Sequence, residues 1–121
     1  MEVQTWVKER RRYPRVSMEL PLDYLLKHDP RVRGGIVIDA SETGLLIYST
    51  QNIPIGTKLR IAVLFPNEYE LANFEVFVEI IWKKAVDRME EGYQYGVKFS
   101  QILKEDYSKL RQLLIEKLLN E

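Results

Sequence analysis

The chain has 121 residues, of which 45% are hydrophobic and 30% charged, and this is the size and balance of one folded globular domain. The charges of its 18 basic and 18 acidic residues cancel to a formal net charge of zero, so the molecule as a whole has no strong attraction for nucleic acid. There is no cysteine, a single histidine (His28), and no apolar stretch long enough for a signal peptide or a membrane span. We therefore expect a cytoplasmic protein without disulfides, metal centre or membrane insertion.

Residues 1–15 form a basic arm, which we expect to be flexible because it is terminal and carries like charges. Between Lys8 and Arg15 there are five basic residues against one acidic residue. This local excess of positive charge indicates an anionic partner near the start of the chain. Three adjacent arginines near a terminus usually form only a solvated arm or a weak anion patch, so the cluster alone does not establish a binding site.

Beyond the arm, six short segments have the apolar alternation or the β-branched and aromatic content of strands. They lie at 16–20, 35–38, 45–49, 59–65, 74–82 and 93–99. Pro21 is expected to end the first strand or to place it at a sheet edge, and Pro66 to break the fourth. Turn signals lie between strands at His28-Asp29-Pro30, Gly34-Gly35 and Pro54-Ile55-Gly56. This spacing predicts an antiparallel β-barrel or sandwich.

The last segment, about 104–120, has helical spacing instead. Its apolar residues recur on one face at Tyr107, Leu110, Leu113, Leu114 and Leu118. Acidic residues in the first turn suit the positive end of a helix dipole. We predict one amphipathic helix that packs on its own sheet, the commoner arrangement, or on another chain. Both a monomer and a dimer therefore stay open, and residues 16–121 are predicted to form a single β domain with this helix.

Two short motifs carry the functional signal. Arg11 and Arg15 form an RxxxR spacing just before the first strand, and DASETG, beginning at Asp39, forms DxSxxG between the second and third strands. A guanidinium can donate two parallel hydrogen bonds to O6 and N7 of guanine, or to a phosphate. The Asp39 carboxylate can accept from N1–H and N2–H₂ on the opposite edge of the base. Serine hydroxyl and backbone N–H groups of a tight turn, here around Ser41, can bind a phosphate oxygen.

Gly44, the last residue of the second motif, allows a backbone geometry or a ligand approach that a Cβ would block. A DxSxxG segment alone is also an ordinary β-turn, and RxxxR alone is weak. The two together, in this order and on these elements, are far more specific. The predicted ligand contains both guanine and phosphate.

The sequence resembles the PilZ domain family of bacteria, whose hallmark is RxxxR followed by [D/N]xSxxG. The similarity covers nearly the whole chain and includes the Ile55-Gly56-Thr57 turn, the Ile80-Ile81-Trp82 strand and the Tyr95-Gly96-Val97-Lys98-Phe99 segment. The resemblance implies a six-stranded antiparallel β-barrel followed by a C-terminal amphipathic helix. It also implies that cyclic di-GMP, a bacterial second messenger, binds the outer surface, with the N-terminal arm folded over the ligand.

Carried over by position, the resemblance gives a set of ligand-binding residues in which no hallmark position is missing. These are Arg11, Arg15, Asp39, Ser41 and Gly44. Arg10 joins them because, in similar domains, an arginine just before the motif accompanies an intercalated ligand dimer rather than one molecule. No other cofactor is implied.

The function implied is that of a receptor or adaptor, which changes conformation on ligand binding and signals to a separate, unidentified protein. The alternative is a ligand-independent PilZ-like protein-interaction module. A nucleic-acid binder is disfavoured by the neutral overall charge, and Trp82, Tyr93 and Tyr95 are expected to pack rather than to stack on bases. An enzyme is disfavoured because no nucleophile and base are paired in the sequence pattern.

Overall fold

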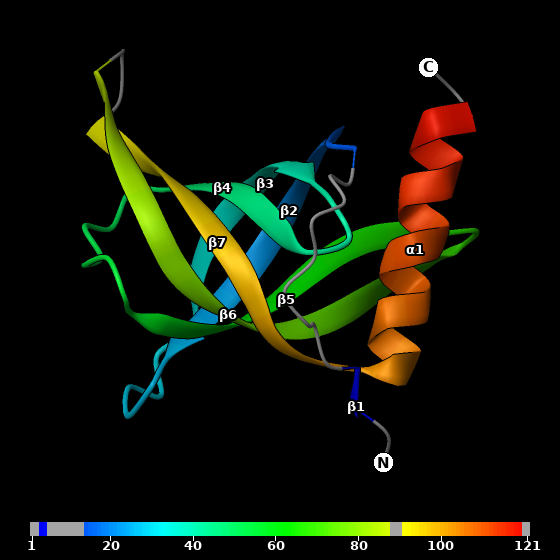
Figure 1. Ribbon diagram of the computed structural model, residues 1–121, viewed down its shortest axis with the longest axis horizontal. Coiled ribbons are helices and arrows are strands. Elements are labelled where there is room, and N and C mark those ends of the chain that lie inside the picture. The colour runs from blue at the N-terminus through cyan, green and yellow to red at the C-terminus, as the bar shows by residue number, and fades with distance from the viewer. Residues whose placement is uncertain (1–2, 5–13, 88–90, 120–121) are drawn as a thin grey trace.

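The computed structural model describes residues 3–4, 14–87 and 91–119 (Figure 1). Its elements are β1 (Val3–Gln4), β2 (Val16–Leu26), β3 (Arg33–Ala40), β4 (Gly44–Ser49), β5 (Lys58–Asn67), β6 (Glu70–Asp87), β7 (Glu91–Leu103) and α1 (Lys104–Leu119). In this part of the chain no helix is both long and apolar enough to cross a membrane.

Six of the strands close into a ring, in which every pairing is antiparallel. Neighbouring strands follow the order β7-β4-β3-β2-β5-β6, and β6 pairs with β7 to complete the circle. This arrangement confirms the mainly β, antiparallel fold with one C-terminal helix that the alternating segments predict. An additional pairing joins β1, within the basic arm, to the end of β7, with Val3 opposite Leu103.

One hydrophobic core fills the inside of the ring. Strand β5 illustrates how alternation builds it, because Leu59, Ile61 and Val63 are buried while Lys58 and Arg60, which alternate with them, are exposed. Side chains of successive strand residues point to opposite faces of a sheet. The apolar half of each predicted strand therefore faces inward, and its polar half covers the outside of the ring.

Two prolines lie inside strands. Pro66 was expected to break its strand, and Pro21 to end its strand or to place it at a sheet edge. Strand β2 continues through Pro21, and β5 continues through Pro66. At each proline the strand has a hydrogen-bonded neighbour on one side only. The ladder between β2 and β5 ends at the pair of Leu22 and Val63, so Pro21 is paired only with β3 and Pro66 only with β6. A missing N–H is tolerated at such positions. The prediction that Pro66 breaks its strand was wrong, and Pro21 fits the edge-like alternative.

The turn signal at Gly34-Gly35 does not mark a turn, since β3 begins at Arg33 and includes both glycines, whereas the predicted strand began only at Gly35. A Cβ on Gly35 would stand 2.6 Å from the carbonyl oxygen of Tyr48 in the neighbouring β4. The glycine therefore serves a close approach of two strands rather than a change of chain direction.

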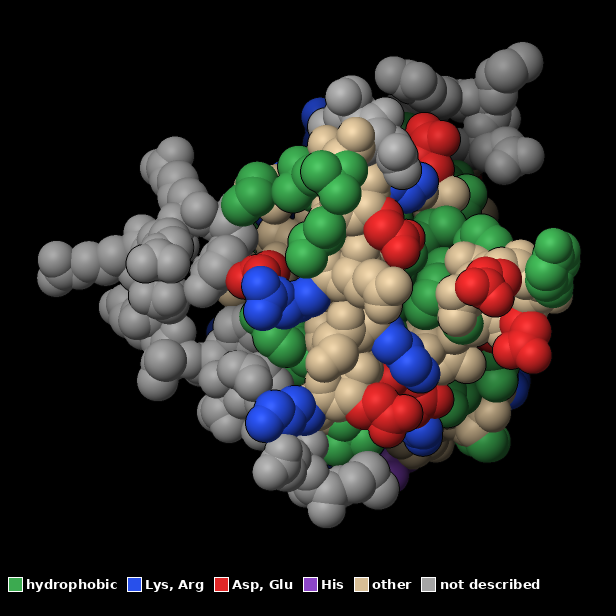
Figure 2. Space-filling view, turned by 90° about the vertical axis from the view of Figure 1, so that its right-hand side faces the viewer, with side chains coloured by type: hydrophobic (Ala, Val, Ile, Leu, Met, Phe, Trp, Pro, Cys, Tyr) green, Lys and Arg blue, Asp and Glu red, His purple; other side chains and the backbone are tan. Residues whose placement is uncertain are grey.

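Helix α1 packs against its own sheet, as the commoner of the two predicted arrangements requires. Leu110, Leu113 and Leu114 are buried in the common core, and the helix contacts β6, β2 and β7. Ile115 and Leu118 of the helix, which lies at the right-hand side of Figure 1, remain about half exposed. Figure 2, which looks onto this side of the molecule, shows hydrophobic side chains interspersed with charged ones of both signs.

Candidate functional site

The pairing of β2 with β3 brings the two sequence motifs together. Arg15 directly precedes β2, Asp39 lies near the end of β3, and Ser17 of β2 is paired with Asp39 in the register. The Arg15 Nη1 donates a hydrogen bond to Asp39 Oδ1 over 2.9 Å, although the two residues are 24 positions apart. The Arg15 side chain is 57% exposed and that of Asp39 22%.

This ion pair leaves most of its hydrogen-bonding capacity open. A guanidinium has five N–H donors, and a carboxylate has two oxygens with about four acceptor sites. Among the described residues, the 2.9 Å contact is the only hydrogen bond found for either side chain. Exposed ion pairs of this kind contribute at most about 1 kcal/mol to stability. A charged ligand could therefore separate the two groups at small energetic cost.

A β-bulge turns Asp39 toward the outside of the ring. The register between β3 and β4 shifts between Val37 and Asp39, and Val37 and Ala40 are both fully buried although they are three residues apart. In a regular strand, residues two apart share a face, so Asp39 would point into the core with Val37. A bulge re-aims side chains in this way. A second shift, between Ser17 and Leu20, lies on the β2 side of the site.

The turn after β3 is held by its own hydrogen bonds. The backbone N–H of Ser41 donates to the Gly44 carbonyl over 2.9 Å, and the N–H of Thr43 donates to Ser41 Oγ over 3.2 Å. Ser41 is buried, with 7% of its surface exposed. Its hydroxyl thus organises the turn beside Asp39, which is the structural role that Asx- and Ser-type turns give such side chains.

Gly44 begins β4 at a point of close contact with β7. A Cβ at this position would stand 2.5 Å from the backbone oxygen of Val97. Its φ does not lie in the left-handed region, where only Gly56 among the described glycines is found. The close neighbour of this hallmark glycine is therefore the next strand, and packing alone is sufficient reason for a glycine here.

The turn also contacts the C-terminal helix. Arg111 of α1 forms an ion pair with Glu42, the residue after Ser41, with 3.2 Å between Nε and Oε1. Nothing in the local sequence around either residue signals this contact, because the packing of α1 alone brings the two groups together.

The outer row that contains Asp39 continues around the ring. In the register, Asp39 is paired with Leu46, Leu46 with Gly96, and Gly96 with Trp82. The Trp82 indole covers Gly96, where a Cβ would stand 2.0 Å from its Nε1, and the residue is still 38% exposed. Trp82 therefore packs on the outside of the sheet, while Tyr95 is fully buried, as the strand context of these aromatics predicts.

Arg10 and Arg11 lie outside the described residues. Of the six predicted ligand-binding residues, the structure thus brings together Arg15, Asp39, Ser41 and Gly44, on the ends of β2 and β3 and the turn that follows.

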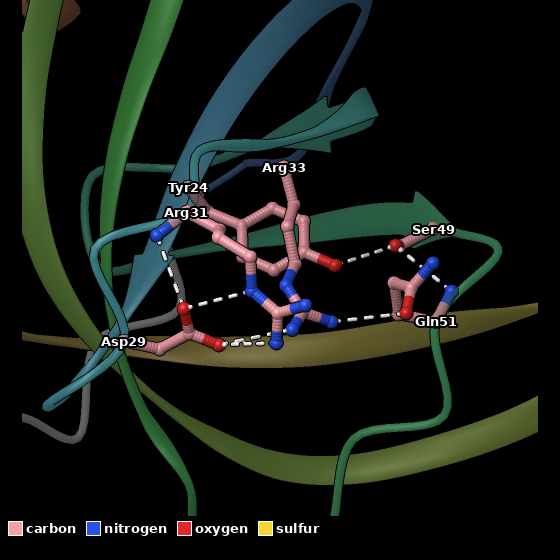
Figure 3. A network of polar contacts seen from close by, with 6 residues as sticks. All are labelled: Tyr24, Asp29, Arg31, Arg33, Ser49 and Gln51. Atoms are coloured by element: carbon pink, nitrogen blue, oxygen red, sulfur yellow. Dashed lines mark hydrogen bonds and ion pairs between the residues drawn. The ribbon is translucent and has the colours of Figure 1, made fainter.

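A second cluster of arginine and aspartate, which the sequence analysis did not identify, closes the loop between β2 and β3 (Figure 3). Asp29 Oδ1 accepts from the N–H and the Nε of Arg31, and Oδ2 accepts from Nη2 of both Arg31 and Arg33, all within 3.1 Å. Arg33 also donates to Gln51 Oε1 over 2.9 Å. The hydrogen bonds from the Arg31 side chain, and then from its backbone, hold the pKa of the Asp29 carboxyl well below its usual range.

Comparison with known proteins identifies the family of this fold and site. The sequence profile of the family described as "PilZ domain" matches residues 9–116 of this chain. The chain belongs to the PilZ domain family. No curated protein matches the sequence of this PilZ domain.

Solved structures share the fold of this PilZ domain at low sequence identity. The PilZ domain of YcgR from Escherichia coli, solved with c-di-GMP, has a TM-score of 0.68 and 14% identity over 93% of this chain and 94% of its own. The Bacillus subtilis inhibitor of motility MotI/DgrA has a TM-score of 0.75 and 19% identity over 94% of this chain. The K. pneumoniae MrkH–c-di-GMP complex has a TM-score of 0.66 and 16% identity over 93%. The chain spans 53% of the length of both MotI/DgrA and MrkH.

Proposed function

We propose that this PilZ domain is a receptor for cyclic di-GMP, which changes conformation on binding and signals to a separate protein. The observation that carries the proposal is the hydrogen bond between Arg15 and Asp39. It brings Arg15 of RxxxR and Asp39 of DxSxxG to one place on the outer surface, as recognition of one ligand by both motifs requires. Related folds support the choice of ligand, since the YcgR domain and MrkH were solved with c-di-GMP.

In the ligand complex the Arg15–Asp39 pair opens and both groups turn to the nucleotide. The carboxylate of Asp39 accepts from N1–H and N2–H₂ of a guanine. Arg11 and Arg15 donate to O6 and N7 of a base or to a phosphate, where bidentate contacts are strong. Because Ser41 and two N–H groups of its turn are already bonded within the turn, we assign the turn mainly the role of holding Asp39 in place.

Arg10 adds a third guanidinium to the arm. We assign it to a second, intercalated cyclic di-GMP molecule, whose phosphates it would help to neutralise. The proposal includes a bacterial cytoplasmic location, where this second messenger is found, and no turnover of the ligand.

Calorimetric titration with cyclic di-GMP, with GTP and cyclic di-AMP as controls, tests the receptor function. We expect saturable binding of cyclic di-GMP alone, at two molecules per chain if Arg10 has its assigned role. An Asp39→Asn variant, which replaces an acceptor oxygen by a donor, should weaken binding by roughly tenfold to 100-fold, as for loss of a charge-assisted hydrogen bond.

The absence of both saturable heat and thermal stabilisation at high ligand concentration would refute the receptor and favour the ligand-independent interaction module. Recovery of a linear dinucleotide after incubation would instead show that the domain is an enzyme.

A further inference from the structure

A groove of about 550 Å³ opens where β2, β5, β6 and β7 lie side by side. Leu25 is paired with Arg60, Arg60 with Phe77, and Phe77 with Gln101, so these four groove residues form one row across four strands. Arg15 and Leu25 lie at opposite ends of β2. Ten residues of extended chain separate them by roughly 30 Å. The groove is therefore separate from the site that contains Arg15 and Asp39.

The groove exposes an apolar surface at the edge of the core, against which Leu26 packs. Leu25, Leu26 and Phe77 line it, and Phe77 is 46% exposed although its strand neighbours Val76 and Val78 are buried. Exposed aromatic side chains beside a concavity are the usual anchoring points of protein interfaces. This surface can accept one or two aliphatic or aromatic side chains.

Positive charge surrounds this apolar surface. Lys27, Lys58 and Arg60 line the groove. Arg60 shares its charge with Glu75 through an ion pair of 2.8 Å. Lys27 and Lys58 form no ion pair among the described residues, although Lys58 is paired with Glu79 in the register of β5 and β6. The groove therefore complements an acidic partner.

We propose that the groove binds an acidic segment of a partner protein. An aliphatic or aromatic side chain of that segment packs on Phe77, and its carboxylates bind Lys27 and Lys58. The proposal deepens the receptor function, on which it rests for the existence of a partner, and names the surface that the partner contacts. Since the nucleotide site lies at the other end of β2, both sites can be occupied together.

Selection from a random peptide library displayed on phage, with the immobilised full chain as target, tests this proposal. We expect enriched peptides that combine two or more acidic residues with an aromatic or aliphatic residue. In ¹H–¹⁵N spectra, an enriched peptide should shift the amide signals of Leu25, Lys58, Phe77 and Gln101. Enriched peptides without acidic residues, peptides that shift signals elsewhere, or no enrichment at all would overturn the proposal.

Two groove variants with matched controls measure how much the apolar surface and the positive charge each contribute to peptide binding. Phe77→Ala should weaken peptide binding about tenfold or more, whereas Tyr69→Ala, at the exposed tip of the β5–β6 hairpin, should not change it. Lys27→Glu with Lys58→Glu should weaken binding at least about tenfold and reduce its dependence on salt. Lys84→Glu with Lys117→Glu makes the same change of net charge away from the groove. Equal losses in variants and controls would contradict the proposal.

Calorimetry with cyclic di-GMP on the same proteins separates the two proposals. If the groove is as proposed, its variants bind the nucleotide like the unchanged protein while losing the peptide. A receptor that binds nucleotide but never an acidic peptide would overturn the groove alone, and peptide binding without nucleotide binding would overturn the receptor alone. Concentration-dependent dimerisation in sedimentation that Phe77→Ala abolishes would show that the groove binds a second copy of the chain instead.

Discussion

The domain contains two clusters of arginine and aspartate that have the same chemical groups but differ in how many hydrogen bonds the aspartate accepts. In the loop cluster of Figure 3, Asp29 accepts four hydrogen bonds from Arg31 and Arg33. At the motif site, Asp39 accepts one hydrogen bond from Arg15. Among the residues that the structure describes, these contacts use the whole acceptor capacity of Asp29 but only a small part of that of Asp39. The difference shows that the count of engaged donors, rather than residue type, separates a structural pair from a candidate ligand site.

The origin of the two pairs explains their difference. Arg31 and Arg33 follow Asp29 by two and four residues, so the loop forms the cluster largely within itself. Arg15 reaches Asp39 only because β2 and β3 pair in the correct register. The Arg15–Asp39 pair lies at two strand ends on the surface of the sheet, where a ligand can take the place of Asp39 beside Arg15 and of Arg15 beside Asp39.

The largest expected effect is a loss of ligand affinity in Arg15→Ala. We expect cyclic di-GMP binding to weaken by about 100-fold or more, the result of losing two charge-assisted hydrogen bonds of roughly 1.5–3 kcal/mol each. Stability should change by less than about 1 kcal/mol because the ion pair is exposed. Arg31→Ala, which removes an arginine from the other cluster, should leave affinity unchanged in the same calorimetric titration. Equal losses of affinity in both variants would remove the distinction between the clusters.

An intermediate effect, a loss of stability, is expected for Gly44→Ala. This variant tests whether the hallmark glycine is needed for the ligand or for the fold. Its Cβ would meet the backbone oxygen of Val97, so β4 and β7 must separate, at a cost of roughly 1–3 kcal/mol. Gly34→Ala is the matched control, since the nearest atom to its Cβ is 4.0 Å away. Urea unfolding of the two variants measures the difference. A fully stable Gly44→Ala protein that no longer binds nucleotide would instead assign the glycine to the ligand.

The smallest effect is the pH dependence of the loop cluster. Because hydrogen bonds from Arg31 lower the pKa of Asp29 in the folded state, its contribution to stability is complete above the ordinary value of about 3.9. That contribution is lost as pH falls below this value toward the lowered pKa. The melting temperature of the unchanged protein should therefore exceed that of Asp29→Asn near neutral pH, and the gap should narrow in acid. A gap that stays constant down to about pH 2.5 would show that Asp29 does not contribute through its charge.

Local patterns in the sequence were enough to predict most of the secondary structure. Alternation of apolar and polar residues predicted the segments that become β2 to β7, and helical spacing predicted α1 from Lys104 onward. These patterns succeed because each strand has one face in the core and the helix buries one stripe. The two motifs also predicted that Arg15 and Asp39 bind one ligand. The structure places the two side chains 2.9 Å apart, and ligand binding stays a prediction.

Only the packed structure shows how those elements are adjusted to each other. The bulge that turns Asp39 outward reverses the face that simple alternation would assign to it. Pro66 can continue β5 because the pairing of β5 with β2 ends at Val63, before the proline. Gly44 is needed because the backbone of β7 lies too close for a Cβ. The contact of Arg111 with Glu42 and the groove beside Phe77 likewise join segments distant in sequence. Periodicity reports whether a residue is inside or outside, but register and the distance between strands depend on partners elsewhere in the chain.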